Sequence, residues 1–132
     1  MSNLQLIEDY QRLIWHDKDT SAIEKYFHPD AVINSPIKKT QGITYLKEVI
    51  QNWHIGFPNL KVFWDDFICQ KDQVVARWHA KGCHEGNFLG ISATNKNISY
   101  TGVTIYQLEN NKVIQYWAFV DMDHIKKQLG QC

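Results

Sequence analysis

Two neighbouring segments near the C-terminus, residues 98–108 and 111–121, constrain the fold more than any other part of the sequence. Both are rich in β-branched and aromatic residues, which favour strands. Asn110 and Asn111 lie at the junction, and asparagine tolerates the positive φ angles of a tight turn. The sequence therefore predicts a long β-hairpin at the centre of a sheet, and we expect a bound molecule to contact its second strand.

The residues after the hairpin predict a short C-terminal helix, because Asp121 is a favourable N-cap and Gly130 suits the position just past a helix end. The rest of the chain predicts, in order, a helix that begins at Ser2, a short helix capped by Ser21 that ends at His28, a strand over 30–35, a polar loop over 38–41, a helix over 42–54, strands over 60–69 and 74–81, and a long connection over 82–97.

This order of elements indicates an α+β fold, because helices come first and strands later instead of alternating. The last four strands follow one another as antiparallel hairpins. We therefore expect a curved antiparallel sheet whose concave face is covered by the N-terminal helices, so that the two layers enclose a pocket. With 132 residues and no internal repeat or linker, the chain is expected to form a single domain over residues 1–132.

The charge pattern argues against nucleic acid and membranes as partners. The 14 Lys and Arg residues balance the 14 Asp and Glu residues without a basic cluster. No apolar run approaches the roughly 20 residues of a membrane span, and the polar, acidic N-terminus does not fit a secretory signal. The three cysteines are odd in number and include no C-x-x-C pair, which fits a reducing cytoplasm better than a disulfide framework.

The sequence also gives no reason to expect a metal or an organic cofactor. The six histidines show neither H-x-H nor H-E-x-x-H spacing, and no glycine-rich phosphate loop or dinucleotide fingerprint is present. The aromatic content, with 5 Trp and 6 Tyr, fits instead a pocket for a small apolar or aromatic molecule.

Several short motifs resemble those of one family. Residues 82–91 with Thr94 are similar to its G-x-H-x-G-x-F-x-G-I…T loop, and residues 111–117 with Asp121 are similar to its G-K-I-x-x-x-W-x-x-x-D strand, with Asn111 in place of the usual glycine. Further matches are residues 28–30, 57–60 and 128–130. On these motifs the chain resembles the SnoaL-like polyketide cyclase family. The resemblance implies the cone-shaped α+β fold of nuclear-transport-factor-2-like proteins.

The resemblance implies a chemistry as well. Characterised cyclases of this family close a polyketide ring by an intramolecular aldol condensation, without a metal or organic cofactor. Their acid/base aspartate falls three residues before the position of Asp121, where this chain has Ala118. Two of their polar pocket positions fall near Gly102 and Thr104. Alanine cannot move a proton, so the resemblance implies the pocket more strongly than the cyclase reaction.

Two ionisable residues remain as candidates for catalysis. His84 lies in a glycine-bracketed loop, and an unperturbed imidazole titrates near neutral pH. Its alternative role is to bond the loop backbone and hold the pocket rim. Asp121 follows the hairpin and would act as a base if desolvated; its alternative role is to cap the terminal helix.

The pocket lining is expected to come from aromatic and small side chains on the inner faces of helices and strands. Arg77 and His79 share a strand face. We expect Arg77 to pair with Asp65 or Asp66 on the neighbouring strand and the side chain of His79 to point into the pocket. The pocket-lining candidates are Trp15, Asn34, Trp53, Phe57, His79, Phe88, Thr104, Tyr106, Tyr116 and Ala118.

Three interpretations of function stay open at this point. The first is a SnoaL-like protein that binds an apolar cyclic molecule and acts on it as a cofactor-free cyclase-type lyase or isomerase. The second is a binding protein without turnover, and the third is an isomerase or hydrolase of the same fold. A homodimer is expected, because the strand over 60–69 carries Val62, Trp64 and Ile68 on one face and Phe63 and Phe67 on the other.

Overall fold

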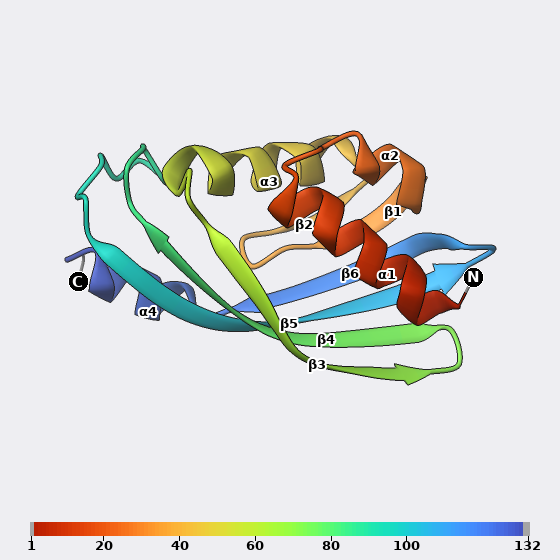
Figure 1. The fold of residues 1–132 in the computed structure, drawn as a ribbon. Helices are drawn as coiled ribbons and strands as arrows, with labels where there is room; N and C mark the ends of the chain where they lie inside the picture. Colours follow the sequence, from red (N-terminus) through yellow and green to blue (C-terminus); the bar gives the residue numbers. More distant parts are fainter. Residues whose placement is uncertain (1, 131–132) are drawn as a thin grey trace.

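The computed structural model describes residues 2–130 and shows the first three helices laid over one side of a curved sheet, with the C-terminal helix at one end of the sheet (Figure 1). The elements are α1 (Asn3–Gln11), η1 (Arg12–His16), α2 (Ala22–Tyr26), β1 (Phe27–Asn34), β2 (Lys39–Gln41), α3 (Thr44–Gly56), β3 (Lys61–Gln70), β4 (Gln73–Cys83), β5 (Asn97–Glu109), β6 (Lys112–Val120) and α4 (Met122–Gln128). The six strands form one sheet in the order β2-β1-β6-β5-β4-β3. The expected α+β architecture is confirmed.

The C-terminal hairpin is present as predicted and lies in the interior of the sheet. Asn110 and Asn111 make its turn with φ angles of 52° and 64°. The side chain of Asp121 caps α4 by accepting a hydrogen bond from the backbone N–H of His124 at 3.0 Å. At the other end of the chain, Ser2 Oγ accepts from the N–H of Gln5 at 3.1 Å and caps α1. Local side-chain chemistry thus sets the ends of both helices.

The segment around Pro29 differs from the sequence prediction. The second helix ends at Tyr26, and β1 already begins at Phe27. Ser21 makes no side-chain capping bond there; its N–H and hydroxyl both donate to Asp19 Oδ1 instead. The strand begins early because β1 pairs in parallel with β6 from Phe27 onward, an arrangement that the expectation of a wholly antiparallel sheet missed. The short strand β2, predicted as a loop, pairs with the end of β1.

A bulge in β3 changes which of its residues face the core. The pairing of β3 with β4 shifts register between Trp64 and Asp66, so the alternation of faces is offset beyond that point. Phe67 packs against the core, whereas Ile68 is 62% exposed. The predicted grouping of Ile68 with Val62 and Trp64 on one face was therefore wrong, because one inserted residue exchanges the faces of everything that follows.

Two apolar clusters fill the space between sheet and helices. The first gathers α1, α2, β1 and the β5–β6 turn region around the buried rings of Tyr10 and Phe27. The second lies beneath α3 and the 82–97 connection, around Trp53, Phe57 and Phe88. Trp15 and Trp64 pack against both clusters. The two clusters meet at a layer of aromatic rings in the middle of the molecule.

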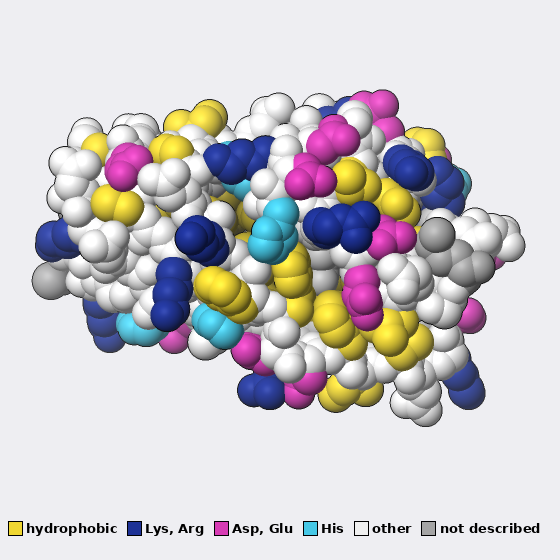
Figure 2. Space-filling view, in the orientation of Figure 1, with side chains coloured by type: hydrophobic (Ala, Val, Ile, Leu, Met, Phe, Trp, Pro, Cys, Tyr) yellow, Lys and Arg dark blue, Asp and Glu magenta, His cyan; other side chains and the backbone are white. Residues whose placement is uncertain are grey.

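The surface carries interspersed charges, in line with the balanced composition. On the face drawn in Figure 2, Lys and Arg lie among Asp and Glu without a large patch of one sign. No helix within residues 2–130 has both the length and the apolar character needed to span a bilayer. Cys69 and Cys83 are free thiols, and Cys132 lies outside the described residues.

Candidate functional site

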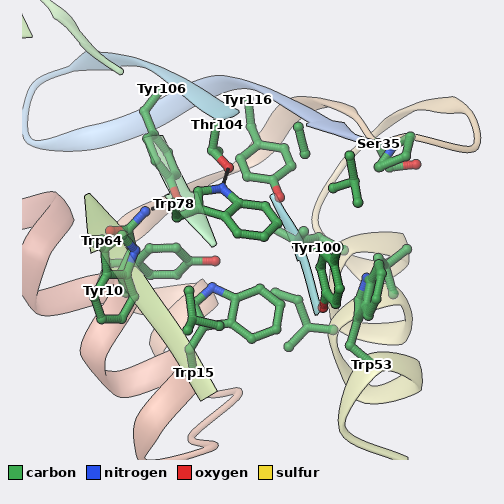
Figure 3. Close-up of a pocket in the computed structure, with 18 residues that line it drawn as sticks. Tyr10, Trp15, Ser35, Trp53, Trp64, Trp78, Tyr100, Thr104, Tyr106 and Tyr116 are labelled. Atoms are coloured by element: carbon green, nitrogen blue, oxygen red, sulfur yellow. Dashed lines mark hydrogen bonds between the residues drawn. The ribbon is translucent and has the colours of Figure 1, made fainter. Parts of the chain in front are cut away.

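A narrow cavity lies between the inner face of the sheet and the helices (Figure 3). Its volume open to the centre of a water molecule is about 40 Å³, which is room for only a few waters. The lining residues are mostly aromatic and apolar: Tyr10, Gln11, Trp15, Ser35, Pro36, Leu46, Val49, Ile50, Trp53, Val62, Trp64, Trp78, Tyr100, Thr104, Tyr106, Tyr116, Ala118 and Val120. In this form the cavity is a slot between rings, so a ligand must be flat or must displace side chains.

Strand alternation and one helix irregularity bring these side chains together. On β5 and β6, Thr104 pairs with Ala118 and Tyr106 pairs with Tyr116, so all four point to the same face. Trp15 comes from η1, a π-helical turn at the end of α1. A π-turn rotates the following side chains relative to a regular helix, and such turns are frequent at functional sites.

The cavity wall beside Ala118 depends on a glycine. A Cβ at Gly102 would lie 2.3 Å from Trp78 Cζ2 and 2.8 Å from the carbonyl oxygen of Phe119. Because Gly102 has no side chain, the indole of Trp78 lies across β5 and donates from Nε1 to Thr104 Oγ1 at 3.0 Å. The Trp78 indole thus forms part of the cavity wall above Gly102, and a residue with a side chain at position 102 would displace the indole.

The polar groups of the lining are neutral. Gln11 Nε2 donates to the hydroxyl of Tyr106 at 3.0 Å, and both residues are buried. Burial raises the pKa of Tyr10, Tyr100, Tyr106 and Tyr116 above the ordinary tyrosine value, because a phenolate would lose its hydration. At neutral pH these hydroxyls are protonated and serve as hydrogen-bond donors and acceptors.

The family model for SnoaL-like polyketide cyclases matches residues 5–129 of the chain. The protein belongs to the SnoaL-like polyketide cyclase family. A comparison with curated proteins found no match. The family assignment therefore rests on the family model.

Solved structures of SnoaL-like and other proteins share the fold. A protein of Jannaschia sp. CCS1 named as a SnoaL-like polyketide cyclase has a TM-score of 0.89 at 20% identity, over 96% of this chain and 90% of that one. TsrD from Streptomyces laurentii has a TM-score of 0.86 at 24% identity, over 98% and 96%. IdmH from Streptomyces antibioticus, proposed to be a polyketide cyclase, has a TM-score of 0.83 at 21% identity, over 98% and 99%. These likenesses establish the fold.

The cavity of this SnoaL-like protein differs from a proton-transfer site in the side chains that line it. Among the described residues that line it, none is an Asp, Glu, His, Lys, Arg or Cys. Ala118, which stands where the resemblance puts the family's acid/base aspartate, lines the cavity with 8% of its surface exposed. Within residues 2–130, no three His, Cys, Asp or Glu side chains lie close enough together to hold a metal ion.

His84, the first catalytic candidate, is fully buried in the 82–97 connection, away from the cavity lining. The N–H of Thr94 donates to His84 Nδ1 at 3.2 Å, so that nitrogen is unprotonated and the ring proton is on Nε2. Thr94 Oγ1 lies 3.0 Å from the same Nδ1. Backbone hydrogen bonds also join His84 to Lys96 and Asn95. These hydrogen bonds fit the alternative role of His84, in which its side chain holds the backbone of the 82–97 connection in place.

Asp121, the second catalytic candidate, caps α4 and borders a groove on the outside of the sheet. The groove also contains Asn34, whose Nδ2 donates to the carbonyl oxygen of Tyr116 at 3.0 Å. Neither residue belongs to the cavity lining. The structure therefore does not bring His84 and Asp121 together at one site, and a catalytic role for either stays a prediction.

Six of the ten pocket candidates line the cavity, namely Trp15, Trp53, Thr104, Tyr106, Tyr116 and Ala118. Phe57 packs in the second cluster beside His84, and Phe88 borders a shallower groove at the end of α3. His79 was wrongly expected to face the pocket. Its Nδ1 lies 2.9 Å from Asp65 Oδ1 and its ring stacks on the exposed Phe63, because it shares the outer face with Arg77.

The expected ion pair of Arg77 is present. Its Nε and Nη2 contact the two carboxylate oxygens of Asp66 at 3.1 and 3.0 Å. The guanidinium holds the pKa of Asp66 below the usual range through this hydrogen bonding.

Sequence reasoning missed twelve of the eighteen lining residues, among them Tyr10, Gln11, Trp64, Trp78 and Tyr100. Alternation from the predicted pocket residues on the hairpin would have found Tyr100, which is on the same face of β5 as Thr104. Trp78 was missed because His79 was taken as the pocket residue of β4, and alternation then turns its neighbour Trp78 to the other face. Gln11 and Trp64 carry no such signal, because a buried glutamine and a half-buried tryptophan look like a surface residue and a core residue in the sequence.

Proposed function

We propose that this protein binds a flat, largely apolar small molecule in the cavity and does not transform it by acid/base chemistry. The observation that supports this proposal is the absence of carboxylate and imidazole groups from the cavity lining within the described residues. A positioned acid or base contributes about 10²–10⁴-fold to a proton-transfer reaction. A wall of rings and aliphatic side chains supplies binding energy but no such group.

The tyrosine hydroxyls do not replace the missing carboxylate. An efficient general acid or base has a pKa near the operating pH. Burial raises the pKa of Tyr116 and Tyr106, which moves both hydroxyls further from neutrality. They are therefore suited to orient a ligand by hydrogen bonds.

The rim of the cavity fits the entry of an apolar ligand. Pro36, Val49 and Trp53 belong both to the cavity and to a neighbouring surface groove, which Ile37 and Leu89 extend. Ile37 is 56% exposed and Leu89 is 43% exposed. An exposed apolar rim of this kind would desolvate an aromatic molecule before it reaches the interior rings.

Binding is tested by filling the cavity from one side of β6. In the Ala118→Leu variant the added carbons extend into the slot, so the affinity for naphthalene-sized probes should fall at least tenfold. The affinity is measured by the quenching of tryptophan fluorescence. Phe119→Leu is the matched control, since it changes an exposed neighbour on the opposite face of the same strand. Equal affinities of both variants and wild type would contradict the proposal.

A second test concerns turnover and separates the proposal from a cyclase function, the other reading that family membership supports. We expect wild-type protein to leave an anthracycline-type polyketide ester uncyclised, and Ala118→Asp to gain measurable cyclisation if the rest of the cavity suits the substrate. Efficient cyclisation by the wild type would overturn the proposal and would return His84 and Asp121 to consideration.

We also infer that two copies of the chain pair through the outer face of the sheet. Phe119 and Phe63 are 57% and 42% exposed on that face, and Ile68 joins them through the bulge in β3. Exposed aromatic side chains on a broad sheet surface favour association. The groove beside Asp121 and Arg77 lies on the same side, so a partner there would cover it. Sedimentation that shows only monomer at micromolar concentration would contradict this inference.

A further inference from the structure

Two buried polar atoms in the cavity lining have no hydrogen-bond partner among residues 2–130. Gln11 donates through Nε2 to Tyr106, but its Oε1 accepts no hydrogen bond, and the indole Nε1 of Trp64 donates none. Gln11 is only 2% exposed. Buried polar groups are nearly always hydrogen-bonded, so each exception asks for an explanation. One acceptor and one donor are thus left free among residues that line the cavity.

Both atoms belong to the same wall. Gln11 and Trp64 line the cavity, and both also line a groove on the far side of that wall with Arg12 and His16. Figure 3 shows Trp64 beside Tyr10, at the end of the slot away from Trp53. Gln11 and Trp64 therefore lie at one end of the slot. Trp53, which the cavity shares with the neighbouring surface groove, lies at the other end.

The two side chains are held in place. The amide of Gln11 is fixed by its hydrogen bond to Tyr106, which is itself 2% exposed. The indole of Trp64 packs against the ring of His16 with centroids 5.2 Å apart. Groups that are already ordered lose little conformational entropy when a ligand pairs with them.

We propose that this wall selects neutral planar aromatic ligands that carry a hydrogen-bond acceptor and a donor on one edge, as a cyclic amide does. The carbonyl oxygen of such a ligand accepts from Trp64 Nε1, and its N–H donates to Gln11 Oε1. This inference rests on the proposed binding function and adds the class of ligand. A hydrocarbon would leave both protein atoms unpaired, and an ionised ligand would lose its hydration without a counter-charge in the lining.

Three probes of similar shape test the pairing. 2-Quinolinone carries both groups, 1-methyl-2-quinolinone lacks the N–H, and 1-methylnaphthalene lacks both groups. In wild type we expect each step down this series to weaken binding by about two- to tenfold, the net effect of one neutral hydrogen bond. Binding is measured by calorimetry or by quenching of tryptophan fluorescence.

Two variants assign the steps to individual atoms. Gln11→Leu should remove the preference for 2-quinolinone over its methyl derivative, and Trp64→Phe should remove the preference for the methylated lactam over 1-methylnaphthalene. Trp53→Phe is the matched control at the other end of the slot, where a smaller ring should weaken all three probes alike and preserve their order.

The outcomes separate this inference from the proposed function. If all three probes bind wild type equally, the cavity binds aromatic molecules but the ligand class is wrong. The same conclusion follows if Gln11→Leu and Trp64→Phe weaken every probe by one factor, since the two residues then act through packing or satisfy each other. If no probe binds, the proposed function itself is overturned.

Discussion

The Ala118→Asp substitution gives a direct measure of how dry the cavity is. Ala118 is 8% exposed and faces Thr104, and its cavity neighbours are aromatic and apolar. A carboxylate that points into this cavity would lose hydration and gain no cationic partner from its described lining, whereas Arg77 lies in the outer groove that Ala118 also borders. Its pKa should therefore rise above the unfolded value of about 3.9.

The sign and the size of the effect follow from proton linkage. A carboxyl whose pKa is higher in the folded protein destabilises it as pH rises through the window between the two pKa values. A rise of two pH units would cost about 2.7 kcal/mol at pH 7. Well below pH ~4 the carboxyl is protonated in both states and this penalty vanishes.

The assay compares urea unfolding of Ala118→Asp with that of Ala118→Asn between pH 4 and pH 8, followed by tryptophan fluorescence. Asparagine has nearly the same shape and cannot ionise, so the difference in unfolding free energy isolates the charge. We expect the two variants to be equally stable near pH 4 and to diverge by about 2–3 kcal/mol at neutral pH. A difference that stays constant across this range would refute the view that the cavity excludes water.

Three further predictions concern other parts of the molecule. Gly102→Ala should cost about 1–3 kcal/mol of unfolding free energy by overpacking, because its Cβ would overlap Trp78; a shift of less than 0.5 kcal/mol in urea unfolding would contradict this. Burial lowers the pKa of His54, whose Nε2 contacts the carbonyl oxygen of Ile14 at 3.1 Å. Stability should therefore fall as pH drops below about 6.5, and His54→Gln should show a shallower loss in thermal melts between pH 7 and 5. Phe119→Glu should yield monomers in sedimentation velocity, whereas Ile37→Glu, which alters an equally exposed residue outside the sheet, should leave the dimer intact.

Part of the candidate site follows from local rules that a single sequence contains. The asparagine turn begins the pairing of β5 with β6 at Glu109 and Lys112. After a register shift between Gln107 and Leu108, strand alternation places Thr104, Tyr106, Tyr116 and Ala118 on one face. Capping chemistry at Ser2 and Asp121 sets helix ends in the same way. The turn and the two helix caps depend on residues close together in the chain, and their prediction was confirmed.

Other features depend on contacts between distant segments. The parallel pairing of β1 with β6 joins the first strand to the last. The bulge after Trp64 exchanges the faces of Phe67 and Ile68, and no residue type at that point signals the inserted position. His79 illustrates the same limit, since a strand assignment alone does not say which face meets the helices.

The sequence by itself determined the α+β class, the central hairpin, the family and the absence of a carboxylate at position 118. Only the tertiary structure decided which aromatic rings enclose the cavity and that Gly102 makes room for Trp78. It alone showed that Gln11 Oε1 and Trp64 Nε1 have no hydrogen-bond partner in the described part of the chain. The physical reason is that hydrogen-bond satisfaction and packing are properties of the assembled interior, where side chains far apart in the chain compete for the same space.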